Sequence, residues 1–331
     1  MARRLRSATR EPSAPVPRDN GDKDSTKSNL QNGPVSSQGT RTQNPTELAI
    51  KLVSPDKPRL PGLDAEETRI LRKKQRRLRV SASSISASAS EFGVHIHNAL
   101  CATFILAQHE AGTAVCIDQA GWILTCAHCF GESEEEWRRN RRKWLLSYTG
   151  LAVQVECRVW DARRDLALGR VVCLEGLALP GEFAFVSLPP LEISGSYTST
   201  SARTPILCIG QPGADDLESE IPQKTDFDLI EISSGRLRGM VVGTDPQDNS
   251  EIGTLKHDAW TYWGHSGAPL LCRKTGALLG LHSSWDDQTA MRHGVPLVAI
   301  LEFLRTHLRG EEEAPGPSEA KELEPEVIVI D

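Results

Sequence analysis

Short apolar runs recur along residues 92–308, and they constrain the fold more than any other feature of the chain. Gly, Pro, Asp and Ser separate the runs, which include residues 103–107, 153–160, 166–174, 205–209, 229–233 and 277–282. Regularly spaced short strands with turn signals are typical of an all-β barrel or sandwich. Two stretches predict helices instead, residues 134–146 and the closing residues 298–308.

The composition changes on either side of this region. Residues 1–60 are rich in Ser, Pro, Asn, Gly and Lys, whereas residues 309–331 are acidic and contain several prolines. Such segments bury too little apolar surface to offset the entropy of ordering. The spacing predicts a short helix near residues 63–80, followed by a Ser/Ala linker. We therefore predict three parts, namely a disordered basic N-terminal region (1–90) with that helix, a folded domain (91–308) and an acidic C-terminal tail (309–331).

Three motifs in the folded domain carry the residue types of a serine hydrolase. The segment GWILTCAH ends at His128, RDLAL contains Asp165, and GHSGAP places Ser266 on a glycine-flanked turn. A serine hydroxyl needs a base to remove its proton, and the base needs a carboxylate to orient it. The order His, Asp, Ser therefore predicts His128 as the base, Asp165 as the orienting carboxylate and Ser266 as the nucleophile. The backbone N–H groups of Gly264 and Ser266 are the expected oxyanion hole.

On these motifs the domain resembles the trypsin-like serine peptidases, in particular the HtrA-type and glutamyl endopeptidase branch. Residues 112–128, 155–168, 258–270 and 292–296 are similar to the segments that form the family's catalytic strands and turns. The resemblance covers residues 92–308. It implies an all-β fold of two six-stranded antiparallel barrels with the active site between them and a C-terminal helix, without a PDZ domain. It also implies an endopeptidase that cleaves protein or peptide substrates through an acyl-enzyme and needs no cofactor.

Two residues depart from the family pattern around the nucleophile. His265 replaces the usual Asp or Asn, and Ala268 replaces Gly or Ser. Because His265 offers no carboxylate to a freed N-terminus, we expect no activation by N-terminal cleavage. The long spacing between Asp165 and Ser266 also predicts an inserted acidic loop near residues 214–226. Two alternatives stay open, a catalytically inactive protease-fold binding module and an HtrA-like quality-control factor.

Three further residues suggest the substrate preference. In the resemblance, Thr261 and His282 match the hydroxyl and imidazole with which glutamyl endopeptidases bind the residue before the scissile bond. Both side chains can form hydrogen bonds to a carboxylate. Ser283 either lines the same pocket or supports Asp165. The alternative is that His282 is a strand histidine packed on Trp285.

The eight cysteines lie between Cys101 and Cys272, most of them within apolar runs. This placement fits buried free thiols better than a disulfide framework, and it favours an intracellular, reducing location. Cys126, His128 and Cys129 have ligand types that suit zinc. Because no second well-spaced pair of ligands follows, we predict no metal.

The two ends suggest partners. A basic run at residues 72–79 is a candidate contact for an import receptor or nucleic acid, or simply a solvated helix face. The strip Val327, Ile328, Val329 and Ile330 beside acidic residues resembles a SUMO-interacting motif; packing on its own domain and no role are the alternatives. Together these features favour the nucleus or cytoplasm over the mitochondrion. No apolar run approaches the roughly 20 residues that span a bilayer, so we expect no membrane contact.

Overall fold

The computed structural model describes residues 50–108, 111–177, 182–189, 203–216, 219, 221 and 223–308. The structural statements that follow concern these residues. Of the segments predicted to be disordered, residues 1–49 and 309–331 lie outside them, as does the proposed SUMO-binding strip. Residues 50–60, also predicted to be disordered, include a strand at Lys51–Val53 and the buried Leu60, because they pack on the first barrel.

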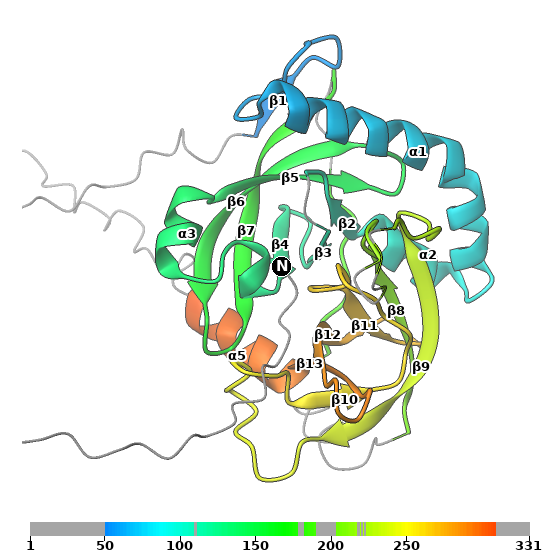
Figure 1. Ribbon diagram of the computed structural model, residues 1–331, viewed down its shortest axis with the longest axis vertical. Coiled ribbons are helices and arrows are strands. Elements are labelled where there is room, and N and C mark those ends of the chain that lie inside the picture. The colour runs from blue at the N-terminus through cyan, green and yellow to red at the C-terminus, as the bar shows by residue number, and fades with distance from the viewer. Residues whose placement is uncertain are drawn as a thin grey trace, which may run out of the picture.

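Six antiparallel strands form the first barrel (Figure 1). They are β2 (Thr103–Leu106), β3 (Thr113–Cys116), β4 (Trp122–Thr125), β5 (Arg142–Ser147), β6 (Ala152–Asp161) and β7 (Leu166–Glu175). Their order is β7-β4-β3-β2-β5-β6, and the pairing of β6 with β7 closes the barrel. A short strand, β1 (Lys51–Val53), adds to β7 in parallel beyond the end of β4.

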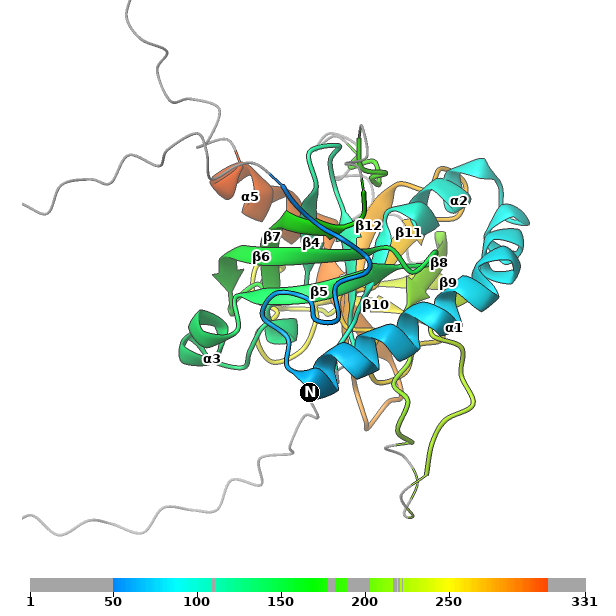
Figure 2. The ribbon, with the colours of Figure 1, turned by 90° about the horizontal axis from the view of Figure 1, so that it is seen from above.

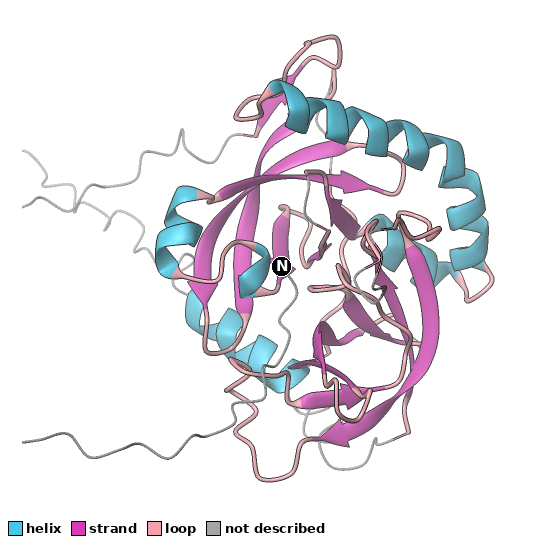
Figure 3. Cartoon of the chain, viewed as in Figure 1, coloured by secondary structure: helices cyan, strands magenta, loops and turns pink. Residues whose placement is uncertain are grey.

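The second barrel is also closed and has six strands. They are β8 (Pro205–Gly210), β9 (Glu231–Met240), β10 (Leu255–His257), β11 (Pro269–Cys272), β12 (Leu278–Trp285) and β13 (Arg292–Pro296), in the order β10-β13-β12-β11-β8-β9. The chain then enters α5 (Leu297–His307), which agrees with the predicted closing helix (Figure 3). The predicted fold class is therefore confirmed, with two six-stranded barrels and a C-terminal helix.

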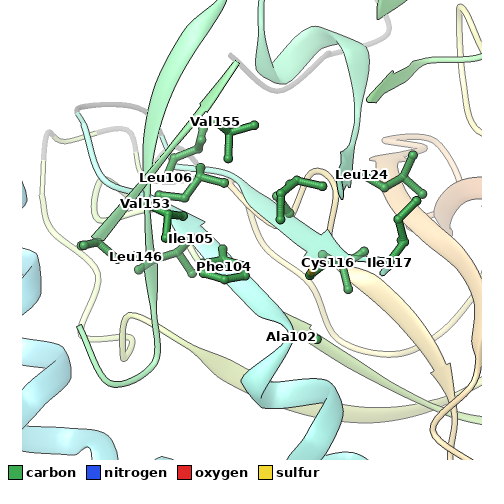
Figure 4. Packing of buried hydrophobic residues seen from close by; sticks show 14 of the residues in the cluster. Ala102, Phe104, Ile105, Leu106, Cys116, Ile117, Leu124, Leu146, Val153 and Val155 are labelled. Carbon is green, nitrogen blue, oxygen red and sulfur yellow. The ribbon is translucent and has the colours of Figure 1, made fainter. Parts of the chain in front are cut away.

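Alternating side chains fill the interior of the first barrel. Leu106, Leu124, Leu146 and Val155 come from four different strands and are all fully or almost fully buried (Figure 4). Strands that are buried along most of their length read as near-continuous apolar runs, which explains why the sequence indicates them so clearly.

The helix before the barrels is longer than the sequence predicts. α1 spans Ala65–Ser90, and α2 (Val94–Cys101) follows, so the residues expected to form a Ser/Ala linker are helical. A capping box between Asp64 and Glu67 starts α1. Its buried positions are Thr68, Leu71, Gln75, Leu78, Ile85 and Ala89, at intervals of three, four or seven residues that place them on one face. Burial of Ile85 and Ala89 outweighs the low helix propensity of the serines around them.

Helix α1 lies along the outside of both barrels (Figure 2). Against the first barrel, Gln75 donates hydrogen bonds to Gly150 O at 3.0 Å and to Glu175 Oε2 at 2.6 Å. Toward the second barrel, Arg77 Nη2 donates to Phe227 O at 3.4 Å. The helix is therefore part of the folded unit, and the predicted boundary at residue 91 does not separate it from the barrels.

The basic run of α1 is divided between structural and exposed side chains. Arg72 pairs with Glu175, and Lys74 Nζ donates to Leu106 O at 2.9 Å and to Gln108 O at 2.6 Å. The remaining basic side chains of the run are exposed, and they are Lys73, Arg76, Arg77 and Arg79. Contact of this run with an import receptor or nucleic acid stays a prediction.

The predicted helix over residues 134–146 is wrong in its second half. Helix α3 spans only Glu134–Arg139, and the chain becomes strand β5 at Arg142. Trp144, Leu145 and Leu146 are buried in the first barrel, so pairing of β5 with β2 and β6 determines their conformation.

All eight cysteines are free, as expected for a chain without a disulfide framework. Of the helices described above, none combines the length and the apolar character needed to cross a bilayer.

Candidate active site

His128 and Asp165 form a hydrogen-bonded pair on the first barrel. Strand β4 leads into a short 3-10 helix, η2 (Ala127–Cys129), which carries His128. Asp165 is the last residue of the turn between β6 and β7. Its φ of 52° lies in the left-handed region, which Asp tolerates better than most residues. His128 Nδ1 lies 2.9 Å from Asp165 Oδ1 and 3.0 Å from Oδ2. Both residues are buried, which strengthens the pair.

The pKa of Asp165 is lowered although burial alone would raise it. The charge and hydrogen bonds of His128 oppose the effect of burial, and the Ser283 hydroxyl adds a hydrogen bond to Oδ2 at 2.7 Å. Asp165 is therefore a carboxylate at neutral pH, as an orienting group for an imidazole must be.

Ser266 sits on a turn of the second barrel in which two nearby positions require glycine. Gly264 and Gly267 on either side have φ of 99° and 82°. A Cβ atom on Gly267 would lie 2.1 Å from Thr113 O and 2.2 Å from Thr125 Oγ1. The turn is anchored to the first barrel, since Thr113 N donates to Ser266 O at 2.8 Å. Ser266 is thus held rigidly at the junction of the two barrels.

Ser283 connects the nucleophile to the His–Asp pair. Its hydroxyl donates to Asp165, and its carbonyl oxygen accepts from Ser266 Oγ at 3.4 Å. Within the described residues, His128 Nε2 is buried and has no hydrogen-bond partner. A bond between serine and base is commonly long or absent before substrate binds.

The backbone at Gly264 is oriented by the loop before residue 217. Gly213 N donates to Trp263 O at 2.5 Å, and the C=O and N–H of one trans peptide point in opposite directions. The Gly264 N–H therefore points away from Gly213, and no residue of the described ranges accepts a hydrogen bond from it or from Ser266 N. Two unpaired amides on one turn are what an oxyanion hole requires.

The expected inserted loop, residues 214–226, also contacts the segment that leads to Ser266. Within it, Asp215 pairs with Lys224 in an antiparallel bridge, and Thr225 Oγ1 donates to Gly213 O at 2.7 Å. Tyr262 OH donates to Asp216 Oδ1 at 3.0 Å, which connects the loop to the segment before Ser266. The described parts of the loop therefore support the segment that leads to the serine turn.

The structure explains how His265 and Ala268 fit. A Cβ atom on Gly210 would lie 2.5 Å from His265 Cδ2 and 2.9 Å from the Ala268 Cβ, so the glycine leaves room for both side chains. His265 is fully buried, and its Nδ1 lies 3.1 Å from both N and O of Tyr262. Burial lowers the pKa of His265 to about 4, so the ring is neutral at pH 7.

A pocket with a cavity of about 220 Å³ opens beside Ser266. It is lined by Phe227, Trp260, Thr261, Tyr262, Trp263, Gly264, Ser266, His282, Ser283, Ser284, Trp285 and Arg292. The structure therefore brings together every residue that the sequence suggests for substrate binding, namely Thr261, His282 and Ser283. Arg292 was missed, because only the register of β13 against β12 reveals that it faces this pocket.

His282 in the pocket lining and His257 behind it are neutral. His257 Nε2 lies 3.0 Å from His282 Nδ1, and both rings are buried. Burial lowers the pKa of His257 to about 3, with Arg292 contributing, and it holds the pKa of His282 well below its ordinary value. At neutral pH neither ring supplies positive charge to the pocket.

One group of possible metal ligands occurs among the described residues, made of Cys126, His128 and Asp165. Cys129, the third ligand of the zinc site considered from the sequence, is not part of it. The thiol of Cys126 is buried, and burial together with Asp165 raises its pKa well above the ordinary value. Asp165 and the Nδ1 atom of His128 already hydrogen-bond each other, so an ion bound through these atoms would disrupt the pair.

Two closed barrels that contribute His and Asp from one side and Ser from the other define the chymotrypsin-like class of serine peptidases. The chain belongs to the trypsin-like peptidase domain family, whose profile matches residues 112–281, just over half of the sequence. The matched segment contains all three candidate catalytic residues.

Among solved structures, the chain is similar to the HtrA-type protease AlgW with a decapeptide. The identity is 16% and the TM-score 0.44, and the match covers 60% of this chain and 52% of that one. The chain thus spans about half the length of AlgW. A search of curated proteins found no match. The predicted closeness to the HtrA-type and glutamyl endopeptidase branch stays a prediction.

Proposed function

We propose that the protein is a serine endopeptidase in which His128, Asp165 and Ser266 act as the catalytic triad. The observation that carries the proposal is the Ser266 turn, which presents the nucleophile and two amides without an acceptor in the described ranges beside a buried His–Asp pair. Ser266 Oγ attacks the substrate carbonyl carbon while His128 Nε2 takes its proton. The amides of Gly264 and Ser266 stabilise the oxyanion, and His128 then protonates the leaving amine.

The resulting ester between Ser266 and the substrate is the acyl-enzyme. Water attacks this ester, His128 accepts the proton from the water, and the proton returns to Ser266 as the acid product leaves.

We further propose that substrates carry Glu before the scissile bond, as suggested by Thr261 and His282. Support comes from the contact between His257 and His282. If His257 Nε2–H donates to His282 Nδ1, His282 keeps its own Nε2–H for the substrate. The opposite arrangement would leave a buried N–H of His257 without an acceptor, since His257 Nδ1 has no partner among the described residues.

A fluorophosphonate probe followed by mass spectrometry tests the proposal. We expect an adduct on Ser266 that is lost in His128→Ala, together with a fall of roughly 10⁴-fold in peptide cleavage for Ser266→Ala. Ser81→Ala is the control, because this serine lies on α1, is not among the residues that line the pocket, and labelling should persist.

One observation favours a second candidate, an inactive protease-fold binding module. The Ser266 hydroxyl contacts Ser283 O rather than His128 in the structure. Failure of a folded sample to label would support this alternative and contradict the peptidase proposal. An intracellular location is also proposed, on the support of eight free cysteines, seven of them buried.

A further inference from the structure

Arg292 is a cation of the substrate pocket that the proposed mechanism does not use. It begins strand β13, opposite Trp285 on β12 and His257 on β10. With Thr261, His282 and Ser266 it lines the pocket. Its place in the fold therefore puts a guanidinium beside the residues that would meet a substrate side chain.

This guanidinium lacks a counter-ion among the residues that the structure describes. The Nε atom is buried without a hydrogen-bond partner. The two acidic residues that adjoin its strand neighbours are engaged elsewhere. Asp286 accepts hydrogen bonds from Gln288 and Thr289, and Asp258 pairs with Arg238. A partly buried charge without a partner is unfavourable, so an anion that enters the pocket would be stabilised there.

Several arginines of the described ranges pair with a carboxylate, whereas Arg170, whose Nε atom is also buried without a hydrogen-bond partner, lies over the Trp122 ring. Arg69, Arg72, Arg138, Arg142, Arg163, Arg164, Arg238 and Arg305 each form an ion pair with a carboxylate. Arg292 differs from them, and it is the one that lies at the pocket.

The charges around the pocket also favour binding of an anion. Among the described residues that line it there is no Asp or Glu. The buried histidines are neutral at pH 7, so Arg292 supplies the permanent positive charge of the lining. Neutral donors alone would bind a carboxylate less strongly than a charged donor does, because charge-assisted hydrogen bonds are about twice as strong.

We propose that Arg292 is a specificity-determining residue that binds the carboxylate of an acidic side chain before the scissile bond. Thr261 and His282 add hydrogen bonds to the same carboxylate, and the aromatic residues of the pocket contact its methylene groups. The inference rests on the proposed peptidase function and adds the charged group that its substrate preference requires.

Matched peptides with Glu or Gln before the scissile bond test this role in the full chain. We expect Arg292→Gln to lower the Glu-to-Gln ratio of kcat/KM by roughly 10- to 150-fold, as expected for a hydrogen bond to a charged group. Cleavage of the Gln peptide should change little, and Arg292→Lys should restore part of the ratio. Arg305→Gln, on α5 and away from the pocket, is the control and should leave the ratio unchanged.

Two results would overturn the inference. One is an equal Glu-to-Gln ratio in wild type and Arg292→Gln, and the other is a wild-type preference for Phe or Leu, which would assign the pocket to apolar side chains. Fluorophosphonate labelling of Ser266 in each variant separates these results from failure of the peptidase proposal itself.

A binding measurement keeps the inference testable without catalysis. In the Ser266→Ala background, tryptophan fluorescence of the pocket reports binding of the uncleaved peptides. Weaker binding of the Glu peptide on Arg292→Gln, with no change for the Gln peptide, supports the role. Equal losses for both peptides contradict it.

Discussion

At the scale of single residues, Gly210 decides whether a histidine fits next to the nucleophile. It lies at the end of β8, against the ring of His265 and the methyl group of Ala268, the two residues that depart from the family pattern. Its role differs from that of Gly264 and Gly267. Those two have positive φ, whereas Gly210 is required because a larger side chain would clash with its neighbours.

We predict that Gly210→Ala lowers the free energy of unfolding by about 1–3 kcal/mol, because the new methyl group overpacks His265 and Ala268. Its kcat/KM should fall as the Ser266 turn shifts. The double variant Gly210→Ala/His265→Asn should lose less than the sum of the two single variants, because part of the clash is with the ring. Urea unfolding of all four proteins measures this coupling, and strictly additive losses would contradict the packing argument.

The sequence predicts the catalytic residues because each stands in a short motif next to an apolar strand. It does not predict Arg292 or Gly210. Arg292 reaches the pocket only through the pairing of β12 with β13, and Gly210 meets His265 across 55 residues of chain. Contacts of this kind depend on strand register, which residue spacing alone does not specify.

At the scale of elements, helix α1 is the largest departure from the expected organisation. Its exposed face is dense in Lys and Arg, and Ile85 is the single strongly apolar residue of its Ser/Ala half, residues 81–90. Hydrogen bonds within the helix support the serines, as when Ser81 Oγ donates to Arg77 O at 3.1 Å. Tertiary packing, invisible in the local sequence, extends the helix by ten residues beyond the predicted end at residue 80.

Leu78→Ala in α1 should lower the free energy of unfolding by about 2–5 kcal/mol, because the side chain is fully buried against the barrels. Val80→Ala is the matched control on the same helix, since Val80 is 87% exposed and alanine favours helix. Chemical denaturation of both variants measures the difference. A small effect at Leu78 would show that α1 is only loosely attached.

At the scale of the whole molecule, the free energy of unfolding depends on pH, because the second barrel buries three histidines in their neutral form. His257, His265 and His282 are buried there, and their pKa values lie below those of an unfolded chain. Between the folded and unfolded pKa values the unfolded chain binds more protons, so stability is complete above about pH 6.5 and falls as the pH decreases.

For His265 alone, with a pKa of about 4 in the folded protein, we predict a loss of roughly 3 kcal/mol between pH 6.5 and pH 4. The His265→Asn variant should show a shallower dependence, since the other two histidines still contribute. Urea midpoints at several pH values compare the two proteins. Parallel curves would mean that His265 is solvated in the native state.

The position of α1 also bears on how the protein folds. Its hydrogen bonds join residues far apart in sequence, with separations of 75 for Gln75 and Gly150, 103 for Arg72 and Glu175, and 150 for Arg77 and Phe227. Contacts of such high contact order close large loops, which is slow. Helix α1 is therefore expected to dock last, and Leu78→Ala should accelerate unfolding in stopped-flow experiments while leaving the refolding rate nearly unchanged.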